Sequence, residues 1–361
     1  MTPARYPSTH HRRGLHSPVK ARALVAMSAL LIGLAACRGA DSTAAATAAP
    51  ATTRQPCRTG TPACYARFDV MPGRFVRTYQ SASLATGDST VTQAVIVVHG
   101  VERNANEYFA AMADAAALAG RLPTTLVVAP QLITADDAPA ADEPVWSSSG
   151  WRAGDLSSSS AALPRISSYA VIDTMLVRLA DRSRFPRLTR IVVAGHSGGA
   201  QLVHRYAAAS RTAGSLTGVA VRLVAANPST WLYLGPERAS GDTFRVPASA
   251  ASCADYDDWH YGVQNRNTYA IAVSTTQLQQ QLVSRDVVVM LGTADTLTAD
   301  LDVSCGADLQ GPRRWHRGQT LMAFMNARYA GHRHRLVTVP NVGHSYRSMF
   351  TATDGVQALF P

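Results

Sequence analysis

Short apolar runs rich in Val and Ile recur along the chain, separated by longer stretches with helical spacing. The runs are nearly continuous rather than alternating, which is typical of strands buried on both faces of a parallel sheet. They cover residues 94–98, 125–129, 190–194, 219–225, 286–291 and 336–339. The helical stretches cover residues 105–119, 167–181, 200–211, 318–329 and 346–359. This alternation predicts a doubly wound α/β fold with a mostly parallel sheet, and residues 68–79 predict antiparallel strands ahead of it.

Two long stretches interrupt the alternation, near residues 133–164 and 229–267. Long loops in a compact domain are usually functional or disordered. Both leave the carboxyl ends of predicted strands, where open α/β sheets bind ligands. We interpret them as lid-like walls of a cleft, with Trp151, Trp231 and Trp259 as candidates for substrate binding. The alternative is that these aromatic side chains cover the core of the domain.

Residues 1–36 have the pattern of an export signal. A basic region ending at Arg22 precedes the apolar residues 23–36, which are too few for the roughly 20 residues of a membrane-spanning helix but suit a secretory signal. Leu34-Ala35-Ala36-Cys37 resembles the bacterial lipobox, in which the signal is cut before a cysteine that carries the lipid. The alternative is an ordinary signal peptide in which Cys37 has no role.

Ala, Thr and Ser dominate the residues that follow, so residues 37–66 are predicted to form a flexible tether before a domain at 67–361. If Cys37 is lipidated, an even set of four cysteines remains, which suits an oxidising compartment. Sequence alone allows three pairings, of which we predict Cys57 with Cys64 and Cys253 with Cys305; four free thiols are the alternative. We therefore expect a location in the bacterial cell envelope.

The composition is that of a globular protein, with 361 residues of which 47% are hydrophobic and 16% charged. The formal net charge is +10, but five basic residues and no acidic residue precede Cys37, which leaves +5 for the remainder. Because no Lys/Arg run or zinc-finger pattern is present, nucleic-acid binding is not predicted. No metal-binding motif such as H-E-x-x-H occurs, and no cofactor is implied.

Gly195-His196-Ser197-Gly198-Gly199 matches the pattern G-x-S-x-G. The pentapeptide alone is weakly specific, but here it follows the predicted strand 190–194 and opens the predicted helix 200–211. This is the strand-turn-helix setting of a nucleophile elbow, in which the serine backbone is strained and larger residues at the glycine positions would collide with their neighbours. The pattern therefore predicts Ser197 as a nucleophile.

On these residues the sequence resembles the α/β-hydrolase superfamily, over roughly residues 68–361. The resemblance implies a catalytic triad in the chain order Ser, acid, His. Asp295 follows the predicted strand 286–291, and His344 follows the last predicted strand, so the implied triad is Ser197, Asp295 and His344. Asp300 and Asp302, in the same loop as Asp295, are the alternatives for the acid.

The resemblance also implies an oxyanion hole made by two main-chain N–H groups. One belongs to Gly198, directly after the nucleophile, and the other to Val101, in the loop after the strand 94–98. His99 and Gly100 resemble the superfamily's H-G signature, and we expect His99 to shape this loop beside the substrate. The tripled-glycine form of the signature is absent.

These features predict a secreted or lipid-anchored serine hydrolase that cleaves carboxylic esters through an acyl-enzyme intermediate. Its expected partners are a small or polymeric ester and a membrane reached through the lipid on Cys37, and a monomer is expected. Two alternatives stay open: an amidase or peptidase with the same triad, and a non-catalytic binding lipoprotein on a hydrolase scaffold. Arg152 and Arg314 could receive an anionic substrate or simply be solvated.

Overall fold

A computed structural model describes residues 55–159 and 163–361 of the chain. The predicted export signal, Cys37 and the first part of the predicted tether lie outside the described residues. Residues 57–66, also predicted to belong to the tether, instead hold a 3-10 helix at Pro62–Cys64 and the first residues of strand β1 (Tyr65–Met71). Ordered structure therefore begins before residue 67.

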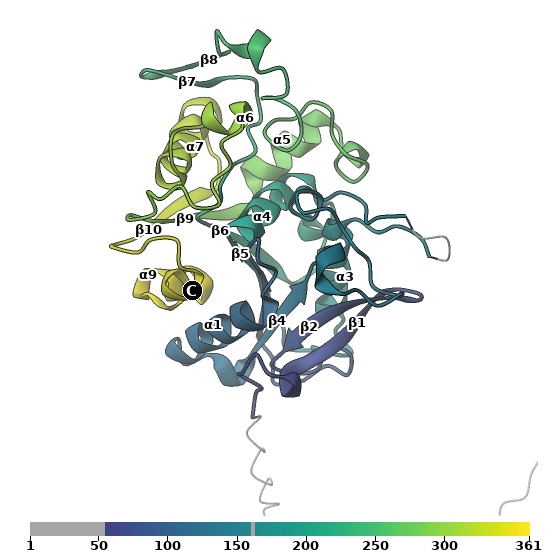
Figure 1. Ribbon diagram of the computed structural model, residues 1–361. Helices are drawn as coiled ribbons and strands as arrows, with labels where there is room; N and C mark the ends of the chain where they lie inside the picture. The colour runs from purple at the N-terminus through teal and green to yellow at the C-terminus, as the bar shows by residue number, and fades with distance from the viewer. Residues whose placement is uncertain (1–54, 160–162) are drawn as a thin grey trace, which may run out of the picture. The chain divides into compact units, whose positions relative to one another are not determined.

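An eight-stranded sheet runs through the described residues (Figure 1), in the order β1-β2-β4-β3-β5-β6-β9-β10. Strand β1 pairs antiparallel with β2 (Arg74–Gln80), and β2 pairs antiparallel with β4. The remaining strands are parallel to one another: β3 (Gln93–Val98), β4 (Thr125–Gln131), β5 (Arg190–His196), β6 (Ala220–Ala226), β9 (Asp286–Gly292) and β10 (His334–Val339). The predicted mostly parallel sheet is confirmed.

Helices cover both faces of the sheet, which explains why its central strands β3, β4, β5 and β9 are apolar almost throughout. One face packs against α3 (Ser168–Ala180), α4 (Gly198–Ala209), α5 (Thr275–Ser284) and α7 (Arg314–Arg328). The other packs against α1 (Ala105–Leu118), α8 (Tyr346–Thr351) and α9 (Thr353–Leu359). Along β3, Ile96 belongs to the first core and its neighbours Val95 and Val97 to the second. The doubly wound α/β fold is therefore confirmed.

The two insertions hold little regular structure. The first contains α2 (Gly150–Ala153), and the second contains the hairpin of β7 (Arg238–Ser240) and β8 (Thr243–Arg245). The second insertion is tied by a disulfide to α6 (Cys305–Asp308), which follows β9.

Both predicted disulfides are confirmed: Cys57–Cys64 and Cys253–Cys305 have Cα–Cα distances of 5.6 and 5.8 Å. Disulfides persist in oxidising compartments, so the two bonds indicate a protein outside the cytoplasm. Among the helices of the described residues, none combines the length and the apolar character needed to cross a membrane.

One predicted helix needs correction, and one helix was missed. The single helix predicted over residues 346–359 is two helices, because Ala352 is extended with ψ 153°. Helix α5 was not predicted, because it is polar and buries only Leu278 and Leu282. Its start does carry a signal, a capping box in which Ser274 and Gln277 each bind the other's main-chain N–H.

Candidate active site

Ser197 lies on a sharp turn between β5 and α4. Its backbone has φ 56° and ψ −118°, a conformation that residues with a side chain adopt only under strain. A Cβ at Gly195 would overlap the main chain of Gly199, and a Cβ at Gly199 would overlap the carbonyl oxygen of Val98. The turn therefore requires both glycines. It is also held by a hydrogen bond of 2.9 Å from the Ser197 N–H to the Ala226 carbonyl oxygen.

Asp295 and His344 are hydrogen-bonded to each other. Asp295 lies in the loop after β9 and His344 in the loop after β10, and because these strands are parallel neighbours both loops leave the same edge of the sheet. Nδ1 of His344 lies 2.7 Å from Oδ2 of Asp295, whose side chain is fully buried. A ring whose Nδ1 donates to a carboxylate has Nε2 left to accept a proton.

Ser197 and His344 line one cavity of about 130 Å³ at this edge. The structure therefore brings the three predicted triad residues together, two of them in the cavity wall and Asp295 behind the imidazole. Cavities at the carboxyl ends of parallel strands are the usual ligand sites of open α/β sheets.

The two alternative acids have other surroundings. Asp302 accepts hydrogen bonds from the Tyr261 hydroxyl at 2.7 Å and from the main-chain N–H of Ser304 at 3.0 Å. Asp300 is exposed at the rim of the cavity, with φ 51°. Of the three aspartates, Asp295 is the one hydrogen-bonded to His344.

Arg314 stabilises the buried Asp295 from behind. Its Nη1 lies 3.7 Å from Oδ1 of Asp295, and neither side chain is exposed. The guanidinium also donates to the carbonyl oxygens of Leu297 and Ala299. Burial lowers the pKa of Arg314, and the charge of Asp295 opposes that shift. A buried carboxylate needs such a partner to stay ionised, so Arg314 supports the site and is not available to an anionic substrate.

Gly198 and Val101, the residues whose N–H groups are predicted to form an oxyanion hole, are neighbours. A Cβ at Gly198 would lie 3.2 Å from Cγ1 of Val101. Gly198 is the first residue of α4, so its N–H has no acceptor within the helix. In the part of the chain that the structure describes, the Val101 N–H donates to no protein acceptor. Val101 lines the cavity with Ser197, whereas Gly198 directly follows Ser197 but does not itself line the cavity.

His99 fixes the loop that carries Val101. Its Nε2 accepts a hydrogen bond of 2.9 Å from the Leu132 N–H, so Nδ1 donates to the Gly100 carbonyl oxygen at 2.8 Å. The ring is completely buried, and burial lowers its pKa to about 4. His99 is therefore neutral at pH 7 and holds the loop by hydrogen bonds. It does not line the cavity, so the prediction that it borders the substrate is wrong.

Comparisons with known proteins agree with this architecture. No protein-family model matches the sequence, and no curated protein matches it. Among solved structures, poly(aspartic acid) hydrolase-1 from Sphingomonas sp. KT-1 is 21% identical, with a TM-score of 0.58 over 82% of this chain and 98% of that chain. A poly(3-hydroxybutyrate) depolymerase from Bordetella parapertussis is 20% identical, with a TM-score of 0.54 over 81% of this chain and 88% of that chain. The chain has the α/β-hydrolase fold.

The tryptophans predicted to bind substrate take other positions in this α/β-hydrolase fold. Trp151 and Trp231 are fully buried, and Trp259 donates from its indole N–H to the Ala153 carbonyl oxygen at 2.8 Å. None of the three lines the cavity. They pack in or against the core on the α4 side of the sheet, so the alternative interpretation of the aromatic insertions is the one that holds.

Arg152 lies closer to Ser197. Its Cδ would be 3.2 Å from a Cβ at Gly198, so the side chain passes beside the turn that carries Ser197. Burial lowers its pKa, and the charge of Asp302 opposes that shift.

Several side chains of the cavity were not predicted, among them Tyr108, His196 and Tyr346. The His196 ring centroid is 4.5 Å from that of His344, and His196 Nδ1 lies 3.1 Å from the Tyr108 hydroxyl. Burial, followed by the nearby His344, lowers the pKa of His196 well below its usual value, so it is neutral beside the catalytic candidate. The position of His196 within the G-x-S-x-G pentapeptide could have indicated that it lies at the site. Nothing in the sequence distinguishes Tyr108 from a core residue.

Tyr346 lines the cavity beside Tyr108. It stacks on Tyr108 at 4.1 Å between ring centroids and donates to Glu107 at 2.7 Å. Burial and this hydrogen bond raise its pKa to about 12, so the phenol keeps its proton at neutral pH.

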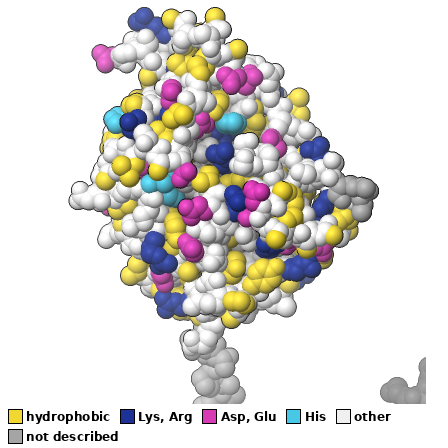
Figure 2. All heavy atoms as spheres, in the orientation of Figure 1, with side chains coloured by type: hydrophobic (Ala, Val, Ile, Leu, Met, Phe, Trp, Pro, Cys, Tyr) yellow, Lys and Arg dark blue, Asp and Glu magenta, His cyan; other side chains and the backbone are white. Residues whose placement is uncertain are grey.

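The mouth of the cavity is acidic. Glu102 and Asp300 line it and are exposed, and its lining holds no Lys or Arg. In Figure 2, acidic side chains border histidine on the face of the molecule that is drawn. Within residues 55–159 and 163–361, no group of three or more His, Cys, Asp or Glu is placed to hold a metal ion.

Proposed function

We propose that this protein is an exported, lipid-anchored serine hydrolase that cleaves carboxylic esters with Ser197, His344 and Asp295. The observation that carries the proposal is the buried Asp295–His344 hydrogen bond at the cavity that also contains the strained Ser197. A serine hydroxyl becomes a nucleophile when an imidazole accepts its proton and a carboxylate stabilises the resulting imidazolium.

The reaction follows from these positions. Nε2 of His344 accepts the hydroxyl proton as Ser197 Oγ attacks the ester carbonyl carbon. The N–H groups of Val101 and Gly198 donate to the oxyanion that forms, and donors of this kind each contribute about 10²- to 10³-fold in kcat. The tetrahedral intermediate expels the alcohol, which takes the proton from His344, and water then hydrolyses the acyl-enzyme by the same proton route.

Replacing the nucleophile tests the proposal. We expect Ser197→Ala to lower kcat on a p-nitrophenyl acylate by about 10³-fold or more, with Ser183→Ala, an exposed serine after α3, as the control. A fluorophosphonate probe should label the wild-type protein and Ser183→Ala but not Ser197→Ala. Full turnover by Ser197→Ala, or no hydrolysis and no labelling of the wild type, would reject the hydrolase; the second result would support a binding lipoprotein.

Ester and amide cleavage are separated by matched substrates. The two structural neighbours are named for a polyamide and a polyester, and the same triad serves both reactions. We expect a p-nitrophenyl ester to be cleaved with a kcat/KM well above that of the anilide with the same acyl group. A higher value for the anilide would favour the amidase.

The lipid anchor has an independent test. Cys37 follows a lipobox-like sequence, and export agrees with the two disulfides. We expect Cys37→Ser expressed in a bacterium to lose incorporation of labelled palmitate and to move from the membrane fraction to the soluble fraction. Unchanged labelling and fractionation would reject the anchor and leave the hydrolase proposal intact.

A further inference from the structure

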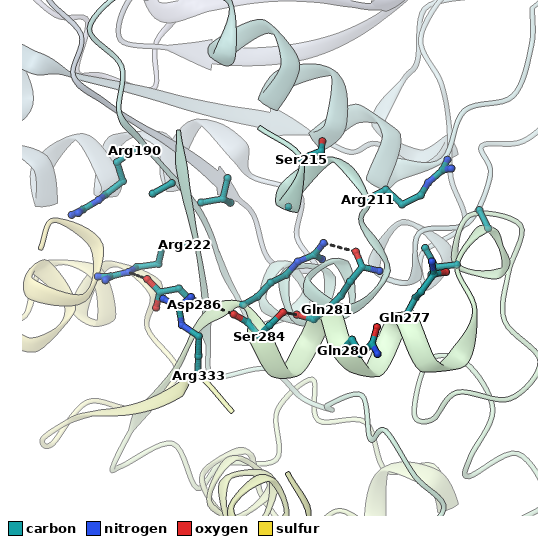
Figure 3. A pocket seen from close by; sticks show the side chains of 16 residues that line it. Arg190, Arg211, Ser215, Arg222, Gln277, Gln280, Gln281, Ser284, Asp286 and Arg333 are labelled. Atoms are coloured by element: carbon teal, nitrogen blue, oxygen red, sulfur yellow. Dashed lines mark hydrogen bonds and ion pairs between the residues drawn. The ribbon is translucent and has the colours of Figure 1, made fainter. Parts of the chain in front are cut away.

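A second, larger cavity lies at the opposite end of the parallel strands, at the amino ends of β5, β6 and β9 (Figure 3). Its volume is about 940 Å³, and its wall includes the first residues of these strands, Arg190, Ala220 and Asp286. Ser197 directly follows the other end of β5. At about 3.3 Å per residue the two sites are roughly 20 Å apart, so the second cavity is not part of the catalytic one.

The wall of this cavity is strongly basic. It holds five arginines and a single acidic residue, Asp286. Asp286 accepts hydrogen bonds from Arg222 at 2.9 Å and from Arg335, outside the wall, at 2.8 Å. Within the described residues, the other four arginines of the wall form no ion pair with an Asp or Glu side chain.

The distribution of charge over the molecule singles out this cavity. Residues 1–54 contain seven Lys or Arg and one Asp, so the formal net charge of +10 falls to +4 for residues 55–361. The five arginines and one aspartate of the wall carry a net charge of +4. The net charge of the wall therefore equals the formal net charge of residues 55–361.

Several of these arginines have donors left over. Arg211 is exposed and has no hydrogen-bond partner in the part of the chain that the structure describes, and Arg333 makes one long contact of 3.5 Å with the Ser284 carbonyl oxygen. Arg190 uses one nitrogen on a main-chain oxygen of Pro361. Arg285 is different, because it is tied to the carbonyl oxygens of Ala207 and Ser210 at the end of α4.

The free donors stand at two ends of the cavity. In Figure 3, Arg190, Arg222 and Arg333 lie on one side, and Arg211 lies across the cavity beyond Gln281, near Gln277 and Gln280. Guanidinium groups match phosphate and carboxylate oxygens in a bidentate geometry. Two separated sets of donors suit a ligand with more than one anionic group.

We propose that this cavity binds an oligoanion of the phosphate type, held by Arg211 at one end and by Arg190 and Arg333 at the other. The ligand carries at least two phosphate-like groups, because a single group reaches only one end. Binding is independent of ester hydrolysis, since none of these residues lines the catalytic cavity.

The test uses tripolyphosphate as the probe, titrated calorimetrically into the purified full-length protein at low salt. We expect saturable binding that is tighter than that of orthophosphate and that weakens as salt screens the charges. The double variant Arg211→Gln/Arg333→Gln should bind at least tenfold more weakly, with unchanged ester hydrolysis. Arg245→Gln, an exposed arginine of β8 outside the cavity wall, is the matched control and should bind like the wild type.

A second part of the experiment distinguishes two possible sources of the phosphate groups, a lipid headgroup and a free oligophosphate. If the natural ligand is a lipid headgroup, vesicles containing cardiolipin, whose headgroup carries two phosphates, should sediment the protein but not the double variant, both in a Cys37→Ser background that removes the proposed anchor, and tripolyphosphate should release it. If it is a free oligophosphate, the vesicles should sediment neither protein while tripolyphosphate still binds. The proposal is overturned if the wild type binds neither probe, or if the double variant binds as tightly as Arg245→Gln.

Discussion

The two ends of strands β5, β6 and β9 carry opposite chemistry. At the carboxyl ends, Ser197 and His344 line a cavity of about 130 Å³ whose mouth is acidic. At the amino ends lies a cavity of about 940 Å³ walled by five arginines, several with free donors. Between them the strand residues are apolar and pack on both faces. In a doubly wound sheet, helices cover both faces and polar sites lie at the two ends of the strands. Here the end that carries Ser197 and His344 is fixed by buried hydrogen bonds, and the other end is lined by a cluster of arginines.

The largest effect should come from the acid of the catalytic edge. We expect Asp295→Asn to lower kcat by about 10³- to 10⁴-fold, because the amide neither stabilises the imidazolium of His344 nor holds its tautomer. Steady-state kinetics on an activated ester measure the loss, and tripolyphosphate binding at the other edge should not change.

Asp302→Asn is the matched control, since Asp302 is hydrogen-bonded to Tyr261 rather than to His344. It should keep kcat within about tenfold of the wild type. A full loss in Asp302→Asn, with near-normal turnover in Asp295→Asn, would reassign the acid.

The two edges should also differ in their tolerance of a methyl group. A Cβ at Gly199 would overlap the Val98 carbonyl oxygen, whereas a Cβ at Gly214, in the basic cavity, would lie 3.3 Å from the end of the Arg285 side chain. We expect Gly199→Ala to lower the free energy of unfolding by about 3 kcal/mol or more, and Gly214→Ala by less than about 1 kcal/mol. Urea unfolding measures both, and equal losses would contradict the tight packing assigned to the elbow.

Acid should weaken the fold in part through His99. Burial lowers the pKa of His99 to about 4 from 6.5, so the unfolded chain binds a proton there at a pH where the folded chain does not. The stability that neutral His99 contributes is complete above about pH 6.5 and is lost as the pH falls toward 4, by up to about 3 kcal/mol.

Urea unfolding between pH 7 and pH 4 measures this dependence. We expect His99→Asn to make the decline shallower, while Arg211→Gln leaves its slope unchanged, because arginine stays charged throughout this range. The same slope in His99→Asn as in the wild type would exclude His99 as a source of the acid sensitivity.

The smallest effect concerns the acidic mouth. Glu102 and Asp300 are exposed, so solvent and salt screen them strongly. We expect Glu102→Gln/Asp300→Asn to raise kcat/KM several-fold for an ester whose alcohol group carries a permanent negative charge, with little change for the neutral analogue. The gain should shrink at high salt, and an unchanged ratio of the two substrates would remove charge at the mouth as a source of selectivity.

The fold could be predicted from the sequence where buried segments consist almost entirely of apolar residues. The central parallel strands are apolar on both faces, so runs such as residues 94–98 and 286–291 stand out without any partner being known, whereas β10 at the edge of the sheet is partly exposed. Helix α5 could not be found in this way, because only Leu278 and Leu282 face the core. The aromatic insertions misled for a related reason: Trp151 and Trp231 are as apolar as cleft residues, and only their packing shows that they are buried.

The sequence by itself determined the position of the candidate nucleophile, because an elbow is local: Gly195 and Gly199, each two residues from Ser197, allow the turn. Tertiary structure decided which carboxylate faces the imidazole, since Asp295, Asp300 and Asp302 share one loop and only one is hydrogen-bonded to His344. It also gathered the arginines of the basic cavity. Residues scattered from 190 to 333 meet there because parallel strands bring their amino ends to one edge, a proximity in space that no spacing along the chain encodes.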